Sequence, residues 1–261
     1  MTWIIGCTTR PHNDLDFSEA CKYISAAGYS DVAVFGNVVT SKSSKKDVAG
    51  IRSAANDSGL TPSMLLGTTN LSDNLEKNIA DYRRLIDNAA ELGAKWLLDC
   101  GTGNEAQFAN YFELMRQCAP HAEIAGVQIT MKPHGGISLT INDLIRANDE
   151  VDHPAFGICY DPGNIIYYTK GELRPELYVE NIASRTTTFI IKDCVLIAGE
   201  PDVMVTPGEG LVDFRRVIGD LVANGFDGPL YLECVGGKAL ADINRDIAAS
   251  LTFVRNILAN Q

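Results

Sequence analysis

The chain has 261 residues, of which 46% are hydrophobic, and this length suits one large core in a single α/β barrel. The formal net charge of -11 at pH 7 disfavours binding to nucleic acids, because an acidic surface repels their phosphates. No apolar run approaches the roughly 20 residues that span a bilayer, the N-terminal sequence lacks a signal-peptide pattern, and the seven scattered cysteines indicate reduced thiols, so we expect a cytoplasmic protein that contacts no membrane.

Short apolar runs alternate with helical stretches along the chain. A helix-like stretch, a glycine and an apolar run recur at 24–35, 89–100 and 221–234, as expected where a left-handed residue ends a helix before a buried parallel strand. Apolar residues also follow helical spacing at 17–27, 75–92 and 243–258, and Asp213 can cap a helix over 214–224. The predicted strands, in chain order, are Trp3–Cys7, Asp31–Phe35, Thr61–Leu66, Trp96–Asp99, Val127–Lys132, Phe156–Tyr160, Thr188–Lys192 and Leu230–Glu233.

Eight strand–helix units in a chain of 261 residues match the count of a (β/α)8 TIM barrel. No linker or low-complexity stretch divides the sequence, so we expect one barrel domain over residues 1–261. A doubly wound open sheet is the alternative. That fold usually carries a glycine-rich phosphate turn after its first strand, and the sequence GCTTRPHND at 6–14 is not such a turn.

Ionisable residues stand at the predicted C-terminal ends of the later strands, where barrel enzymes carry their active sites. Lys132 ends the fifth strand, Asp161 follows the sixth, Lys192 ends the seventh and Glu233 ends the eighth. A charge at the end of an apolar strand is costly unless it is paired or used. We therefore predict that these four side chains converge at one mouth of the barrel. Two structural alternatives stay open: Glu233 forms a buried ion pair with either lysine, and Asp161 caps a turn.

Three further residues near these strand ends have a predicted role or position. His134 precedes two glycines, and we expect either a ligand contact or a loop histidine that bonds to the backbone. Asp193 is a candidate partner for Lys192, which it follows directly. His12 is predicted to lie on the surface rather than in the pocket.

Several segments, in their order and spacing, resemble the sugar phosphate isomerase/epimerase family of xylose isomerase-like TIM barrels. The resemblance covers nearly the whole chain and is specific for the superfamily rather than for one reaction. The matching segments are AAGYSDVAVF at 26–35, MKPHGG at 131–136, YDPGN at 160–164, FIIKDC at 189–194, GEGLVDF at 208–214 and LYLEC at 230–234.

The resemblance implies a metal site that this sequence matches only in part. Typical members hold one divalent metal through Glu, Asp, His and Glu from strands five to eight. Asp161 and Glu233 match two of these positions, whereas Lys132 and Ile190 replace the strand-five Glu and the strand-seven His. In one interpretation, no metal is bound and Lys132 supplies the fixed positive charge. In the other, a divalent metal (Mn, Mg, Co or Zn) shifts toward His134, Asp161 and Glu233.

The resemblance further implies an isomerase or epimerase of a sugar, sugar phosphate or polyol, acting by proton abstraction next to a carbonyl through an enediolate. Glu233 would be the base and Lys132 would stabilise the enediolate. The expected substrate contacts are His134, Asp161, Asn164 and Lys192. A lyase or dehydratase acting on a keto-sugar or inositol-like substrate, and a non-catalytic sugar-binding barrel, are the alternatives. An endonuclease is disfavoured by the acidic charge, and the resemblance is compatible with a homo-oligomer.

Overall fold

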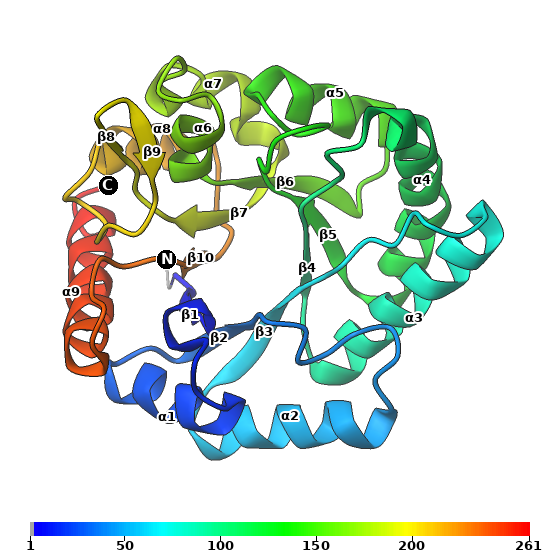
Figure 1. Ribbon diagram of the computed structural model, residues 1–261, viewed down its shortest axis with the longest axis horizontal. Coiled ribbons are helices and arrows are strands. Elements are labelled where there is room, and N and C mark those ends of the chain that lie inside the picture. Colours follow the sequence, from blue (N-terminus) through cyan, green and yellow to red (C-terminus); the bar gives the residue numbers. More distant parts are fainter. Residues whose placement is uncertain (1–2) are drawn as a thin grey trace.

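A closed ring of eight parallel strands forms the centre of the computed structural model, which describes residues 3–261. The ring order is β1-β10-β7-β6-β5-β4-β3-β2, and the helices surround it (Figure 1). This confirms the predicted (β/α)8 TIM barrel, with strand ends no more than two residues from the predicted positions. The barrel strands are β1 (Ile5–Thr8), β2 (Asp31–Val34), β3 (Thr61–Leu66), β4 (Trp96–Asp99), β5 (Gln128–Met131), β6 (Phe156–Tyr160), β7 (Thr186–Ile191) and β10 (Leu230–Leu232).

The helices begin and end at local signals in the sequence. The Asn74 side chain accepts a hydrogen bond from the backbone N–H of Lys77 at the start of α3, and Asp213 caps α8 in the same way, as predicted. None of the helices that the structure describes is both long enough and apolar enough to cross a membrane. The helices are α1 (Phe17–Ala26), α2 (Lys45–Asp57), α3 (Leu75–Leu92), α4 (Phe108–Ala125), α5 (Ile141–Val151), α6 (Pro162–Tyr168), α7 (Val179–Ile182), α8 (Phe214–Ala223) and α9 (Leu240–Leu258).

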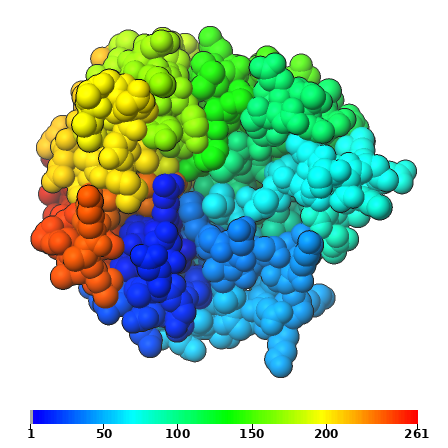
Figure 2. All heavy atoms as spheres, viewed as in Figure 1, coloured from blue at the N-terminus to red at the C-terminus, as the bar shows by residue number. Residues whose placement is uncertain are grey.

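Two apolar layers hold the fold together. The larger one fills the space between the strands and the helices, as expected where parallel strands are covered by helices. The smaller one fills the barrel interior and is made of Ala33, Phe35, Met64, Leu98, Cys159, Ile190 and Tyr231. The space-filling view shows segments of the chain arranged in sequence order around the barrel face (Figure 2). Because the interior is packed, a ligand can be held only at the ends of the barrel.

A buried carboxyl group lies at the N-terminal end of the barrel interior. Tyr231 donates a hydrogen bond of 2.8 Å to Asp31 Oδ1, and Ser63 donates one of 2.5 Å to Oδ2. Burial raises the pKa of Asp31 to about 6, although these hydrogen bonds partly oppose the rise. The folded protein therefore holds a proton at Asp31 at pH values where the unfolded chain has already released it.

Replacing Asp31 with asparagine should make the protein relatively more stable as the pH rises. Between the ordinary pKa of 3.8 and the raised value of about 6, ionisation of the unfolded chain lowers the stability of the wild type by up to about 3 kcal/mol. The Asp31→Asn variant lacks this loss, so its unfolding free energy minus that of the wild type should increase between pH 4 and pH 7 in urea titrations. The exposed Asp227 provides the control, as Asp227→Asn. A difference for Asp31→Asn that stays constant over this range would contradict the assignment.

The segment that follows β7 forms a hairpin of β8 (Val195–Ile197) and β9 (Glu200–Asp202) beside the barrel. Asp193 anchors this segment at both ends, because its carboxylate accepts backbone N–H groups at 2.8–3.0 Å from Cys194, Gly208, Gly210 and Val212. The predicted pairing of Asp193 with Lys192 is wrong, since the lysine bonds to other carboxylates. Lys192 and Asp193 follow β7 directly, and neighbouring side chains of an extended chain point to opposite sides.

Candidate active site

A cavity of about 500 Å³ opens at the C-terminal mouth of the barrel. One wall is apolar and includes Phe17, Phe35 and Leu66. The polar residues are supplied mainly by the segments that follow β1, β4, β5 and β10, and they include Arg10, His12, Cys100, Lys132, His134 and Glu233. This position matches the end of the barrel at which enzymes of this architecture carry their active sites.

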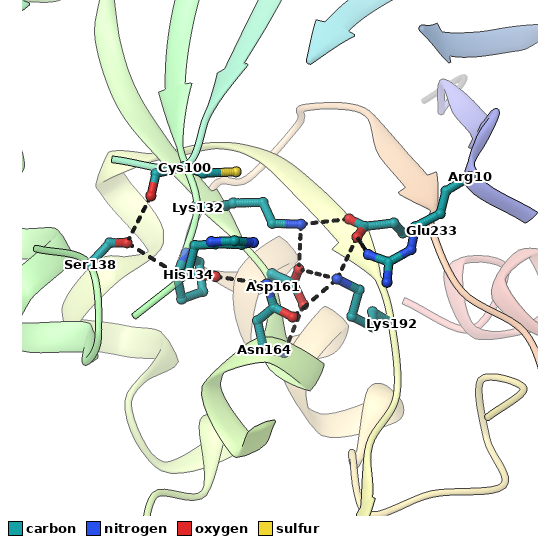
Figure 3. Close-up of polar contacts among 10 residues, drawn as sticks. Arg10, Cys100, Lys132, His134, Ser138, Asp161, Asn164, Lys192 and Glu233 are labelled. Carbon is teal, nitrogen blue, oxygen red and sulfur yellow. Dashed lines mark hydrogen bonds and ion pairs between the residues drawn. The ribbon is translucent and has the colours of Figure 1, made fainter. Parts of the chain in front are cut away.

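The four predicted strand-end residues converge beside this cavity (Figure 3). Lys132 Nζ lies 2.6 Å from Glu233 Oε2 and 3.2 Å from Asp161 Oδ2. Lys192 Nζ lies 2.6 Å from Glu233 Oε1 and 3.3 Å from the same Asp161 oxygen. We call these four residues the ionic cluster. All four side chains are at most 3% exposed, so each charge depends on its partners for the stabilisation that water would otherwise give.

The electrostatics of the ionic cluster favour its charged form. Burial alone would raise the pKa of Glu233, but the two lysines outweigh it and hold that pKa well below the usual range. Burial opposes the charge on Lys132 as well, yet Glu233 and Asp161 raise its pKa well above the ordinary value. The ammonium of Lys132 and the carboxylate of Glu233 therefore stay ionised at neutral pH.

Asp161, Asn164 and Lys192 lie behind the cavity rather than on its surface. Asp161 Oδ1 accepts the backbone N–H of Asn164 at the start of α6, so this residue is a turn cap as well as an ion partner. The Asn164 side chain accepts a hydrogen bond of 3.0 Å from Lys192 and donates one of 2.7 Å to the carbonyl of Pro133. The start of α6 packs closely here: a Cβ on Gly163 would lie 2.6 Å from the carbonyl oxygen of Lys192. These contacts fix the position of the Lys192 ammonium.

His134 lines the cavity next to Lys132, and its ring leans on Tyr168 at a centroid distance of 5.2 Å. Its backbone N–H, rather than its ring, bonds to Ser138. Burial, followed by the charges of Lys132 and Lys192, lowers the pKa of His134 below 6.5. The imidazole is therefore neutral at pH 7 and can accept or relay a proton.

Three cavity residues were missing from the predicted set. Arg10 Nη1 bonds to Glu233 Oε1 at 2.8 Å, and its position at the end of β1 is the same signal that identified the other charges. His12 is only 3% exposed, with Nε2 2.8 Å from Asn244 Oδ1, so its predicted surface location is wrong. The short helical turn Arg10–His12, with proline at its centre, folds the histidine inward. Burial raises the pKa of Cys100 to about 12, so it remains a thiol.

The donors at the mouth do not fit a divalent cation. The carboxylates of Asp161 and Glu233 meet across two ammonium groups, and a metal between them would have to displace both. Ile190 is fully buried and has no lone pair to offer at the strand-seven position. In residues 3–261 no three His, Cys, Asp or Glu side chains are grouped so that they could hold a metal, and this includes the set of His134 with the two carboxylates.

The comparisons with known proteins agree with the fold. A xylose isomerase-like TIM barrel protein from Mycobacterium smegmatis, solved in complex with magnesium, is 19% identical, with a TM-score of 0.79 and 98% coverage of both chains. D-psicose 3-epimerase from Clostridium cellulolyticum H10, solved with D-tagatose, is 14% identical, with a TM-score of 0.78 and coverage of 97% of this chain and 99% of that one. The 3-keto-D-glucoside 4-epimerase from E. coli is 16% identical, with a TM-score of 0.74 and coverage of 98% of this chain and 100% of that one.

No curated protein matches the chain in sequence. The three solved structures are only 14–19% identical to the chain, so their similarity shows the fold alone. The family model described as xylose isomerase-like TIM barrel matches residues 21–257, which is most of the sequence. The chain therefore belongs to the xylose isomerase-like TIM barrel family.

Proposed function

We propose that the protein is an isomerase or epimerase that acts on a sugar, sugar phosphate or related polyol through an enediolate. The observation that carries the proposal is the pair of Lys132 and Glu233, which lies on the surface of the cavity. A proton next to a carbonyl becomes removable when a positive charge stabilises the oxyanion that forms. This pair offers such a charge and a carboxylate side by side.

Lys132 is the electrostatic stabiliser in this mechanism. Its ammonium has three N–H groups and donates one hydrogen bond, to Glu233 Oε2, while Asp161 Oδ2 at 3.2 Å is an ion partner. A donor therefore remains for a substrate oxygen. Asp161, Asn164 and Lys192 act as positioning residues, because they hold Lys132 and Glu233 in place from behind. The fixed cation does the work that a Lewis acid does in other barrels, and the mechanism needs no group beyond this chain.

Glu233 is the proposed base. Its lowered pKa makes it a weak base at rest, because two buried ammonium groups hold its negative charge. When the developing enediolate oxygen shares Lys132, that hold weakens and the carboxylate becomes more basic. The neutral imidazole of His134 lies on the same surface. It takes up the proton held by Glu233 and, as an imidazolium, delivers it to the other face or to the neighbouring carbon, which restores both groups.

The structural neighbours support this class of reaction, since two of the solved structures described above are sugar epimerases. A lyase or dehydratase would use the same proton abstraction and then lose a leaving group. The mass of the product separates the two, because isomerisation leaves the mass unchanged. Binding without turnover across the whole substrate panel would instead favour a sugar-binding barrel.

The test is exchange of a substrate C–H proton with D2O, followed by NMR over a panel of ketoses, keto-acids and their phosphates. The wild type should exchange one proton next to the carbonyl, and Glu233→Gln should abolish this exchange because it removes the base. Exchange that continues in a folded Glu233→Gln variant would reject Glu233 as the base. His134→Gln is the matched comparison: if His134 were the base, this variant would lose exchange while Glu233→Gln kept it. Circular dichroism establishes that each variant is folded.

A further inference from the structure

We infer that the substrate is a sugar acid whose carboxylate binds Arg10 on the β1 side of the cavity. This inference rests on the proposed function and names the substrate class for the same site. It begins with the charges around the cavity. The ionic cluster contains two ammonium groups and two carboxylates, so it is neutral as a unit. Arg10 adds a third cation, and its carboxylate partner among residues 3–261 is Glu233, which the ionic cluster already counts.

The other titratable groups at the mouth do not cancel this charge. His134 is neutral at pH 7 because its pKa is lowered, and Cys100 remains a thiol. Asp16 lies on the rim, exposed to water, and its Oδ1 accepts the backbone N–H of Glu19 at 2.9 Å as the cap of α1. Water and the helix start therefore stabilise the Asp16 charge locally. One positive charge, on Arg10, is left for a ligand.

Arg10 is also the most accessible cation of the site. Its side chain is 43% exposed, whereas those of Lys132 and Lys192 are 3% and 1% exposed. Only Nη1 has a partner, Glu233, among residues 3–261. The remaining nitrogens of the guanidinium keep their donors for a ligand, and the planar fork matches a carboxylate through two parallel hydrogen bonds.

The geometry of Glu233 connects this cation to the reaction. One oxygen of Glu233 bonds to Lys132 and the other bonds to Arg10, so the carboxylate lies between the two cations (Figure 3). A substrate with its carbonyl at Lys132 and its carboxylate at Arg10 would present the intervening C–H to Glu233. The apolar wall that includes Phe35 and Leu66 suits the C–H face of a sugar.

The charge balance favours a carboxylate over a phosphate. A monoanion neutralises the single unbalanced charge of Arg10. A phosphate monoester carries close to two negative charges at pH 7 and would leave an excess negative charge beside Glu233. A bound carboxylate also shares the positive charge of Arg10, which weakens the stabilisation of the ionised Glu233.

Calorimetric titration at low salt tests the inference without any need for turnover. The probes are D-glucuronate, D-galacturonate, D-gluconate and D-galactonate, against D-glucose, D-galactose and D-glucose 6-phosphate. The wild type should bind at least one acid about tenfold to a hundredfold more tightly than its neutral counterpart, as expected for a charge-assisted pair. Arg10→Met should remove this selectivity, and Arg10→Lys should keep part of it. Arg216→Met, which removes an exposed arginine of α8, is the matched control and should leave selectivity unchanged.

The inference is overturned if no acid binds the wild type more tightly than its neutral sugar, if Arg10→Met keeps the selectivity, or if D-glucose 6-phosphate binds more tightly than every carboxylate. An equal loss of acid and neutral ligands in Arg10→Met also overturns it, since Arg10 would then act only through the shape of the site. Failure of the proposed function is recognised separately. Selective binding of acids without any proton exchange rejects the enzyme, whereas exchange of neutral ketoses with no preference for acids rejects the sugar-acid site.

Discussion

Replacing Lys192 with methionine should lower the free energy of unfolding by about 3–5 kcal/mol, the usual cost of removing one partner from a buried ion pair. Lys192 donates hydrogen bonds to Glu233 and Asn164 and forms an ion pair with Asp161, and its side chain is 1% exposed. The variant leaves Lys132 as the only buried counter-ion of two carboxylates. One of these must then bind a proton or admit water, and both cost stability. Urea denaturation at pH 7 measures the change.

Lys170→Met is the control, because Lys170 is 66% exposed and lies 3.7 Å from a surface glutamate. Its effect should stay within about 0.5 kcal/mol, as is usual for substitutions at the surface. A Lys192→Met variant that is as stable as this control would show that the ionic cluster is hydrated rather than closed. The Lys192→Met variant should also lose activity through a lower kcat, with KM little changed, because Lys192 does not line the cavity.

Exchanging two residues should convert the ionic cluster into a metal site. The double variant Lys132→Glu/Ile190→His supplies the Glu, Asp, His and Glu pattern that is typical of the family, together with Asp161 and Glu233. Four such donors suit a divalent cation, and the substitution removes the ammonium of Lys132 from between the carboxylates. The single ammonium of Lys192 then faces three carboxylates, which hold enough negative charge for a metal as well. We expect the double variant to bind Mn²⁺ at least about a hundredfold more tightly than the wild type, a change of ~2.7 kcal/mol.

Calorimetry and the electron paramagnetic resonance signal of free Mn²⁺ both report this binding without an activity assay. Each single variant is a control: Ile190→His alone should gain little, because both ammonium groups still occupy the space between the carboxylates. Elemental analysis of the purified wild type completes the test. One equivalent of tightly bound metal in the wild type would contradict the argument that its donors do not fit a cation.

The strands and the mouth could be predicted from the sequence because both depend on local patterns. Parallel strands that are buried on both faces appear in the sequence as short apolar runs. A closed barrel brings their C-terminal ends together irrespective of how the helices pack. A charge that ends such a run, as at Lys132 or Glu233, can only point to that mouth or to the helices. The predicted pairing of Lys192 with Asp193 failed because neighbouring side chains along an extended chain point to opposite sides.

Whether a site residue lines the cavity or lies behind it could not be predicted from local patterns. Asp161 and Glu233 follow the same kind of strand, yet only Glu233 lines the cavity, because α6 begins at Pro162 and covers Asp161. The inward turn of His12 depends on its contact with Asn244, which is 232 residues away. The pairing of Arg10 with Glu233 spans 223 residues and depends on the closure of the barrel between β1 and β10. Such contacts follow from the tertiary fold, which local sequence patterns do not encode.

Asp193 makes the segment that follows β7 tolerant of substitution. Its carboxylate binds main-chain N–H groups, which every residue except proline can supply, so most side chains between 195 and 207 can change without loosening this anchor. Thr206 is an exception, because its hydroxyl donates to Asp246 and accepts the backbone N–H of Gly236. Beyond this stretch, Gly210 is constrained as well, since a Cβ there would lie 2.3 Å from the Asp193 carboxylate. Because no residue of that stretch lines the cavity, related proteins could differ widely there while the ionic cluster is inherited intact.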